Sequence, residues 1–387
     1  MTMKEYVIAG ADVLLDDFAF HKRCVTVRNG GISEISLSPP EGLERIDAAG
    51  LRLLPGLVET HFHGAQGVTF QCPDREGVKK VAAFEASMGI TSIFPTISSS
   101  ADDVAQGAIR TIRAAAEEGT AGAKIRGIHL EGPFLSEEYR GAHPKEDLFI
   151  PSPERLDVYR KAGGDWIRIL TIAPEINGAE ETIRYARRHS ITVELGHSGA
   201  DYATAMKAID LGANVATHTF NAMRPLRHRD PGVLGAVLTD GRVTCEVICD
   251  MRHVEEPVVR LIYLAKGADL INIVSDSMYG AGLPEGVYHM EGRTRTVKDG
   301  LAYLDDGTIS GSACTSMHGF RNLVGMGIPV EEVSKMASRN PARTAGILDK
   351  TGTITVGKDA DLILLNPALE VVSTFVEGRC VYGGGTR

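Results

Sequence analysis

Strand-like apolar runs alternate with helical patterns through the middle of the chain. Most of the runs are separated by segments with apolar residues at helical spacing, such as REGVKKVAAFEASMG and AEETIRYARRHS. The predicted strands span residues 54–61, 91–96, 124–131, 167–175, 191–197, 213–220, 243–250 and 270–276. Eight strands with intervening helices over about 220 residues predict an α/β fold of the (β/α)8 TIM-like barrel type.

Both ends of the chain have a different pattern, with short alternating runs typical of β-structure. Asn29-Gly30-Gly31 predicts a hairpin between CVTVRN and ISEISL. TGTITV and DLILLN, on either side of Gly357-Lys358-Asp359, predict a second hairpin, and VVSTFVEGRCVY a third. We expect one small β domain built from residues 1–52 and 349–387, around a barrel of residues 53–348.

Composition excludes several classes of function. The chain has 387 residues, 43% hydrophobic and 24% charged, with a net charge of -9. It has no Lys/Arg run for nucleic acid and no stretch of ~18 apolar residues for a membrane. The start lacks the pattern of a secretory signal, and the six scattered cysteines contain no C-x-x-C pair. These features predict a cytoplasmic protein that binds neither membrane nor nucleic acid.

Histidines and acids end five of the predicted strands. His61 and His63 are two residues apart, so their side chains leave a strand on the same face. Each histidine alone fits a structural role, but a barrel brings all these strand ends to one mouth. Imidazoles and carboxylates gathered there predict a site for a divalent Zn- or Fe-type ion. The residues are His61, His63, Glu131, His197, His218 and Asp276.

A doubly wound open sheet is the alternative fold, and it binds ligands where its strand order reverses. The barrel is favoured because the polar residues end strands 1, 3, 5, 6 and 8, which only a closed ring brings together.

Several motifs make the chain resemble the N-acetylglucosamine-6-phosphate deacetylases of the amidohydrolase superfamily. HLEGPFL, GAHP, ELGHS, THTFNAM, HRDPGVLG, DGTISGS and NPAR match, and the resemblance covers nearly the whole chain. It implies a (β/α)8 barrel with a small β-sandwich from both termini. The implied reaction is metal-dependent removal of the acetyl group from an N-acetyl amino sugar 6-phosphate.

The resemblance also implies roles for individual residues. Glu131, His197 and His218 match the ligands of a metal common to all members. His61 and His63 match the pair that holds a second metal in some members, with Glu131 bridging. One or two ions per chain are therefore expected, most simply Zn, with Fe, Co, Mn or Ni as alternatives.

Asp276 matches the catalytic carboxylate, which passes a proton from water to the departing amine; the alternative is a further metal ligand. His143 matches a residue that contacts the sugar and polarises the amide carbonyl. Asn221, Ala222 and Ser312 match positions that meet the substrate.

Two basic residues match the phosphate contacts of the family. Arg229 matches a phosphate-binding arginine, and His253 matches a contact contributed across a dimer interface, which implies a homodimer. A solvated arginine and a loop-capping histidine are the alternatives for these two positions.

Ser275-Asp276-Ser277 departs from the T-D-A of the family, which leaves the sugar open. N-acetylgalactosamine 6-phosphate is therefore an alternative substrate. A hydrolase of N-acyl amino acids or cyclic amides, and a binding protein without catalysis, are the alternative functions.

Overall fold

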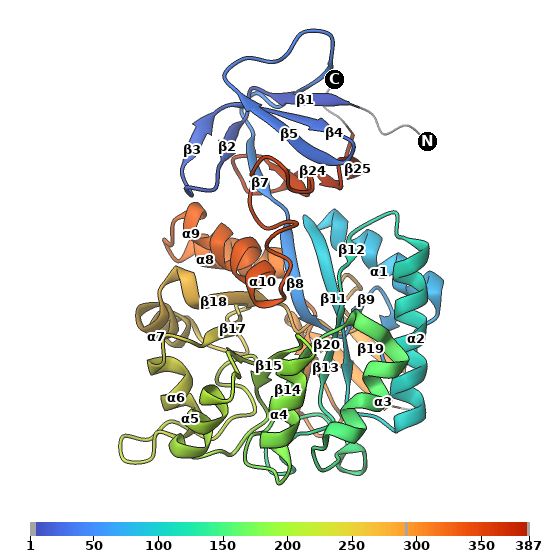
Figure 1. Ribbon diagram of the computed structural model, residues 1–387, viewed down its shortest axis with the longest axis vertical. Coiled ribbons are helices and arrows are strands. Elements are labelled where there is room, and N and C mark those ends of the chain that lie inside the picture. Colours follow the sequence, from blue (N-terminus) through green and yellow to red (C-terminus); the bar gives the residue numbers. More distant parts are fainter. Residues whose placement is uncertain (1–4, 291–292, 385–387) are drawn as a thin grey trace.

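The centre of the molecule is a nearly closed parallel barrel, described here from a computed structural model covering residues 5–290 and 293–384. Figure 1 shows the barrel below a smaller body made from the two ends of the chain. The barrel strands are β8 (Leu57–Phe62), β11 (Ile90–Ser98), β13 (Ile128–Glu131), β14 (Ile167–Ile172), β15 (Thr192–Leu195), β16 (Val215–Ala216), β17 (Thr244–Ile248) and β18 (Ile271–Val274). They neighbour one another in chain order, as the alternating pattern predicts, with β12 (Lys124–Ile125) also pairing with β11. The (β/α)8 fold is therefore confirmed.

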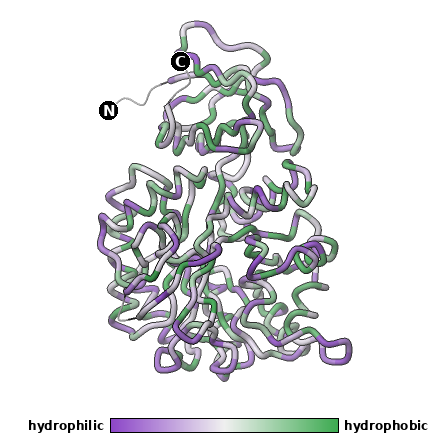
Figure 2. The backbone as a smooth tube through the Cα atoms, turned by 180° about the vertical axis from the view of Figure 1, so that it is seen from behind, coloured by the Kyte–Doolittle hydropathy of each residue, from purple (hydrophilic) through white to green (hydrophobic). Residues whose placement is uncertain are grey.

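Helices cover the outside of the barrel because their apolar faces pack against the strands. Val78 and Val81 of α1, for example, are fully buried. The helices are α1 (Arg75–Ser87), α2 (Asp102–Glu118), α3 (Pro153–Gly163), α4 (Ala179–Arg188), α5 (Tyr202–Asp210), α6 (Gly232–Thr239), α7 (Glu256–Lys266), α8 (Ser316–Gly325), α9 (Val330–Ser334) and α10 (Asn340–Thr344). In Figure 2 the most hydrophilic segments are loops along the lower edge. Among the described residues, no helix is both long and apolar enough to cross a membrane.

Backbone hydrogen bonds join the first and last barrel strands at their carboxyl ends. The N–H of Asp276 donates to the carbonyl of His61 at 3.0 Å, and the N–H of His63 donates to the carbonyl of Ser277 at 2.7 Å. The seam of the barrel is thus closed by residues of the predicted site.

Two further sheets form the small body from both ends of the chain. One contains β5 (Gly31–Ser36), β4 (Cys24–Arg28), β1 (Tyr6–Ala9) and β6 (Glu44–Asp47) in that order. The other contains β25 (Arg379–Tyr382), β24 (Val371–Val376), β23 (Leu362–Leu365), β7 (Arg52–Pro55), β2 (Asp12–Leu14) and β3 (Phe20–Lys22). Side chains from both sheets share one apolar core. The domain boundaries at 52/53 and 348/349 stay a prediction.

Two of the three predicted hairpins form. Asn29 and Gly30 have φ of 51° and 82°, which suits the turn between β4 and β5. β24 and β25 form the last hairpin. The hairpin around Gly357-Lys358-Asp359 is wrong: β23 pairs with β7 and β24, and TGTITV contributes only an isolated bridge between Ile354 and Leu15.

A four-stranded antiparallel sheet follows the last barrel strand and was not predicted. It contains β19 (Gly286–Met290), β20 (Arg293–Lys298), β21 (Leu301–Tyr303) and β22 (Ile309–Ser312). The N–H of Ser312 donates to the carbonyl of Asp276 at 2.9 Å, so β22 is attached beside the barrel seam. We call this unit the mouth sheet. Its position brings residues 307–311 to the pocket described below.

A buried ion pair joins the barrel to the small body. Arg126 donates to Asp359 at 2.7 Å and to Asp361 at 2.8 Å. The side chain of Asp361 is fully buried, and that of Arg126 is 8% exposed. Removing the guanidinium leaves a carboxylate buried without a positive partner.

Replacing Arg126 with Met should therefore lower the free energy of unfolding by ~3–5 kcal/mol. Urea unfolding followed by circular dichroism measures the change. Arg45→Met is the matched control, because the Arg45–Asp47 pair is exposed and should contribute less than about 1 kcal/mol. Equal effects of the two substitutions would contradict the prediction.

Candidate metal centre and catalytic pocket

The six residues of the predicted metal site, His61, His63, Glu131, His197, His218 and Asp276, lie at or just beyond the carboxyl ends of barrel strands. Three of them have left-handed backbone, with φ of 48° at His197, 28° at His218 and 47° at Asp276. This conformation is uncommon for residues with a Cβ and persists only where surrounding structure enforces it. The turn redirects each side chain from the strand into the mouth of the barrel.

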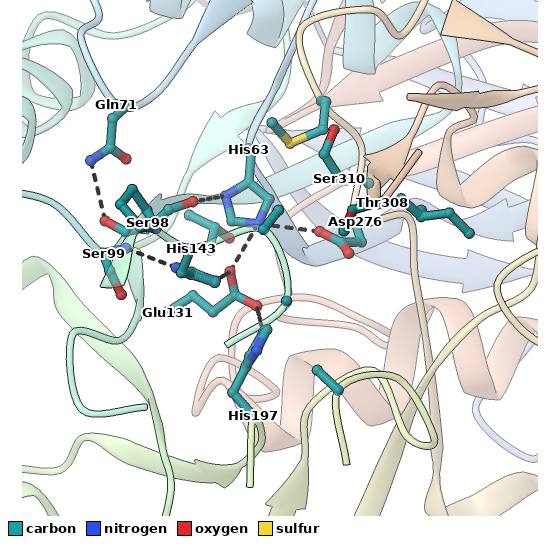
Figure 3. A pocket seen from close by; sticks show the side chains of 18 of the residues that line it. His63, Gln71, Ser98, Ser99, Glu131, His143, His197, Asp276, Thr308 and Ser310 are labelled. Carbon is teal, nitrogen blue, oxygen red and sulfur yellow. Dashed lines mark hydrogen bonds and ion pairs between the residues drawn. The ribbon is translucent and has the colours of Figure 1, made fainter. Parts of the chain in front are cut away.

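Glu131 lies at the centre of the cluster, with imidazoles around both carboxylate oxygens (Figure 3). Its Oε1 is 3.1 Å from Nε2 of His197 and 3.1 Å from Nε2 of His218, and those two nitrogens are 3.1 Å apart. Ligands of a tetrahedral zinc ion lie ~3.3 Å from one another, given bonds of about 2.0–2.1 Å. Glu131, His197 and His218 therefore have the spacing of metal ligands.

The tautomer of His197 supports this conclusion. Nδ1 of His197 is 2.8 Å from the carbonyl oxygen of Tyr139, which can only accept, so Nδ1 carries the proton. Nε2 then presents a lone pair toward the other two ligand atoms. Lone pairs that face one another at this distance are stabilised by a cation between them.

A second group of ligand atoms lies beside the first. Nε2 of His63 is 3.2 Å from Oε2 of Glu131 and 3.2 Å from Oδ1 of Asp276. Nε2 of His61 is 3.3 Å from Oε1 of Glu131 and 3.8 Å from Oδ1 of Asp276. Because Glu131 belongs to both groups, the arrangement can hold one divalent ion or two with this carboxylate between them.

Side chains behind His61 and His63 orient both rings. Nδ1 of His61 is 2.9 Å from Oε2 of the buried Glu246, and Nδ1 of His63 is 3.0 Å from the hydroxyl of Ser98. A carboxylate accepts the Nδ1 proton, which leaves Nε2 of His61 available for a metal. Neither Glu246 nor Ser98 was predicted from the sequence. Glu246 could have been found, because a carboxylate inside the apolar run VTCEVICD needs a buried partner.

Charges in the cluster shift the pKa values strongly. Burial lowers the pKa of His63, but Glu131 and Asp276 outweigh it and raise the pKa to about 9. Burial raises the pKa of Asp276, but His63 and His61 outweigh it and lower the pKa to about 2. The pKa of Glu131 is likewise held well below its usual range by the neighbouring imidazoles, although burial opposes this shift. Glu131 and Asp276 are thus both ionised at neutral pH, and cation binding would displace protons from the imidazoles.

His143 differs from the other imidazoles because it can act only as a donor toward the cluster. The backbone N–H of Ser99 donates to Nδ1 at 3.2 Å, so the ring proton is on Nε2, which is 3.1 Å from Oε2 of Glu131. Burial is the main cause that lowers the pKa of His143, to about 4. A neutral imidazole with a fixed N–H donor can polarise a carbonyl group.

A cavity of about 830 Å³ opens above the cluster. Its lining combines the barrel mouth with the mouth sheet, and Figure 3 shows Thr308 and Ser310 on the side of Asp276. The predicted residues that line it are His63, Glu131, His143, His197, His218, Asn221, Ala222, His253 and Asp276.

Three predicted residues do not line this cavity. His61 is fully buried and contributes to the cluster from below. Ser312 is also fully buried, and its hydroxyl accepts a hydrogen bond from the N–H of Cys314 at 2.7 Å. Arg229 is exposed in the loop before α6. The roles of Ser312 and Arg229 as substrate contacts stay predictions.

His253 lines the cavity of its own chain. Its Nδ1 is 2.6 Å from Oδ2 of Asp250, and its buried Nε2 has no hydrogen-bond partner. Burial lowers the pKa of His253, but the bond to Asp250 outweighs it and raises the pKa. No second subunit is required to bring this residue to the site.

Comparison with known proteins extends this description. Residues 52–381 match the Amidohydrolase family. The N-acetylglucosamine-6-phosphate deacetylase of Bacillus subtilis (strain 168) is 35% identical over 366 residues, covering 92% of each chain. The N-acetylgalactosamine-6-phosphate deacetylase of Escherichia coli O157:H7 is 30% identical, covering 97% of this chain and 98% of the relative.

A solved structure is similar over almost the entire length. It is a mutant of the N-acetyl-D-glucosamine-6-phosphate deacetylase of Mycobacterium smegmatis in complex with N-acetyl-D-glucosamine-6-phosphate. The similarity has a TM-score of 0.91 and 30% identity, covering 98% of this chain and 99% of the other. Together with the barrel and its cluster of histidines and acids, these matches establish that the chain is a hydrolase and belongs to the amidohydrolase family.

Proposed function

We propose that this hydrolase removes the acetyl group of N-acetylglucosamine 6-phosphate, producing glucosamine 6-phosphate and acetate. The observation that carries the proposal is the convergence of Glu131, His197 and His218 beside Asp276 and His143, at the base of one cavity. The relatives described above act on this class of phosphorylated amino sugar, according to their names.

Glu131, His197 and His218 would hold the principal metal ion, and His61 and His63 a second one with Glu131 between them. Zinc suits a ligand set of imidazoles and one carboxylate, and Fe, Co, Mn or Ni are alternatives. A divalent ion bound there would act as a Lewis acid and would lower the pKa of water towards neutrality.

Asp276 acts as the proton carrier in this proposal. Asp276 is ionised at neutral pH, and an ionised carboxylate beside the ligand atoms can accept a proton from the attacking water. The water oxygen forms a bond to the amide carbon, and the carbon–nitrogen bond then breaks. Asp276 returns the proton to the departing nitrogen, which leaves as the amine.

His143 and the residues around the cavity position the substrate. The Nε2–H of His143 is fixed by the bond at Nδ1 and donates to the carbonyl oxygen of the acetyl group. Asn221, Ala222 and His253 contact the sugar phosphate from the cavity wall. The family resemblance adds three further parts to the proposal. Arg229, which is exposed in the single chain, binds the phosphate, and Ser312 meets the substrate. The protein is a homodimer in the cytoplasm.

The galactosamine sugar is not favoured as the substrate. The relative with that activity is 30% identical, against 35% for the Bacillus subtilis glucosamine enzyme, and the solved complex contains the glucosamine sugar.

A substrate panel tests the proposed activity. The purified protein, supplied with Zn²⁺, should release acetate faster from N-acetylglucosamine 6-phosphate than from the galactosamine isomer or from unphosphorylated N-acetylglucosamine. Amine release in each reaction is the measurement. A preference for an N-acyl amino acid or a cyclic amide, or metal binding without turnover, would refute the proposal.

Replacing Asp276 with Asn should lower kcat by ~10²–10⁴-fold, because the amide keeps the shape but cannot carry the proton. Metal content, measured by plasma mass spectrometry, should stay near that of the unchanged protein. Near-full activity would remove Asp276 from the mechanism, and loss of metal would make it a ligand instead.

Replacing Glu246 with Gln should weaken metal binding at the His61–His63 pair by ~10–100-fold, because the negative charge that holds the Nδ1 proton of His61 is replaced by a neutral amide. Titration of the metal-free protein with Zn²⁺, followed by calorimetry, gives the affinity and stoichiometry.

Glu194→Gln is the matched control for this substitution. Burial, with the nearby charge of Glu246, raises the pKa of Glu194 well above its usual range, so an amide resembles the acid already present. Similar losses in both variants would indicate a general effect on the barrel core, not an effect on His61.

A further inference from the structure

One buried arginine of the mouth sheet has nitrogen atoms without a hydrogen-bond partner among the described residues. Arg295 lies on β20, lines the catalytic cavity and is only 6% exposed. Its Nε and Nη1 atoms have no hydrogen-bond partner. It forms no ion pair within the part of the chain that the structure describes.

A guanidinium group stays charged at any physiological pH, so burying it unpaired is unfavourable. Its Cζ lies 5.3 Å from the centre of the Tyr279 ring, and this cation–π contact offsets only part of the cost. The side chain is therefore suited to an anion that comes from outside the chain.

The strand fixes the direction of the Arg295 side chain. Arg295 and Val297 are buried, whereas Thr296 between them is half-buried and Lys298 is exposed. Val297 packs beside Gly280, and Arg295 pairs with Tyr288 of β19 in the ladder. This alternation points Arg295 to the barrel side of the mouth sheet.

Arg295 and Arg229 occupy opposite environments. Arg229 is exposed and does not line the cavity, whereas Arg295 and the unpartnered Nε2 of His253 both do. The guanidinium fork matches the oxygen geometry of a phosphate monoester, to which it can donate two parallel hydrogen bonds.

We propose that Arg295 binds the phosphate group of the substrate inside its own chain, and thereby makes the enzyme specific for phosphorylated amino sugars. This proposal rests on the proposed function for the identity of the substrate, but the anion site itself does not depend on the chemistry at Asp276.

The test compares Arg295→Met with the unchanged holoenzyme on N-acetylglucosamine 6-phosphate and on unphosphorylated N-acetylglucosamine. Met keeps a long apolar stem against Tyr279. We expect kcat/KM to fall by about 10–100-fold for the phosphorylated sugar, mainly through KM, and to stay within about twofold for the other. Equal losses on both sugars, or no loss on either, would overturn the proposal.

Two further variants complete the experiment. Lys298→Met removes an exposed cation from the same strand and should leave kcat/KM unchanged for both sugars. Arg295→Lys keeps the charge without the fork and should lose less than Met; it also carries the test if the Met variant does not fold. If Lys298→Met and Arg295→Met lower kcat/KM for the phosphorylated sugar equally, the overall positive charge of the strand, and not a phosphate site at Arg295, determines the preference.

Calorimetric titration with inorganic phosphate separates this proposal from the proposed function. The unchanged protein should bind phosphate, and Arg295→Met should bind it at least about 10-fold more weakly. If no amino sugar phosphate is hydrolysed but this difference is found, the activity proposal fails and the anion site stands. Equal phosphate affinities in the two proteins would refute the role of Arg295, whatever the activity.

Discussion

The site depends on the attraction between one buried carboxylate and the imidazoles gathered around it. Imidazole nitrogens lie beside both of its oxygens: Nε2 of His61 is 3.3 Å from Oε1 of Glu131, and Nε2 of His63 is 3.2 Å from Oε2. The imidazoles hold its pKa well below the usual range although burial opposes this shift. The carboxylate therefore remains charged in an apolar barrel, where an uncompensated charge would be very unfavourable.

The barrel and the positions of its polar strand ends could be predicted because their signals are local. Strands such as Ile167–Ile172 consist mainly of apolar residues, and a polar residue after such a strand falls at the same end of a parallel barrel. Glu131, His197 and Asp276 were found in this way. Their separations in the sequence are large, but the topology alone brings them together.

The remaining features depend on pairings that no local pattern specifies. Residues 362–365 are apolar enough for any central strand, and whether they pair with TGTITV or with β7 is decided by packing across the small body. The mouth sheet has polar, charged strands such as RTRTVK, which are also typical of loops. Glu246 was missed because its partner His61 is 185 residues away in the sequence.

The seam between β8 and β18 links architecture to chemistry. The backbone of His61, His63 and Asp276 makes the hydrogen bonds that close the ring, while their side chains form the cluster. Any ligand that favours the assembled cluster therefore also favours the closed ring, by the same free energy. Slow amide exchange at this junction would then report ligand occupancy, and loss of the ligand would first loosen the barrel where its two ends meet.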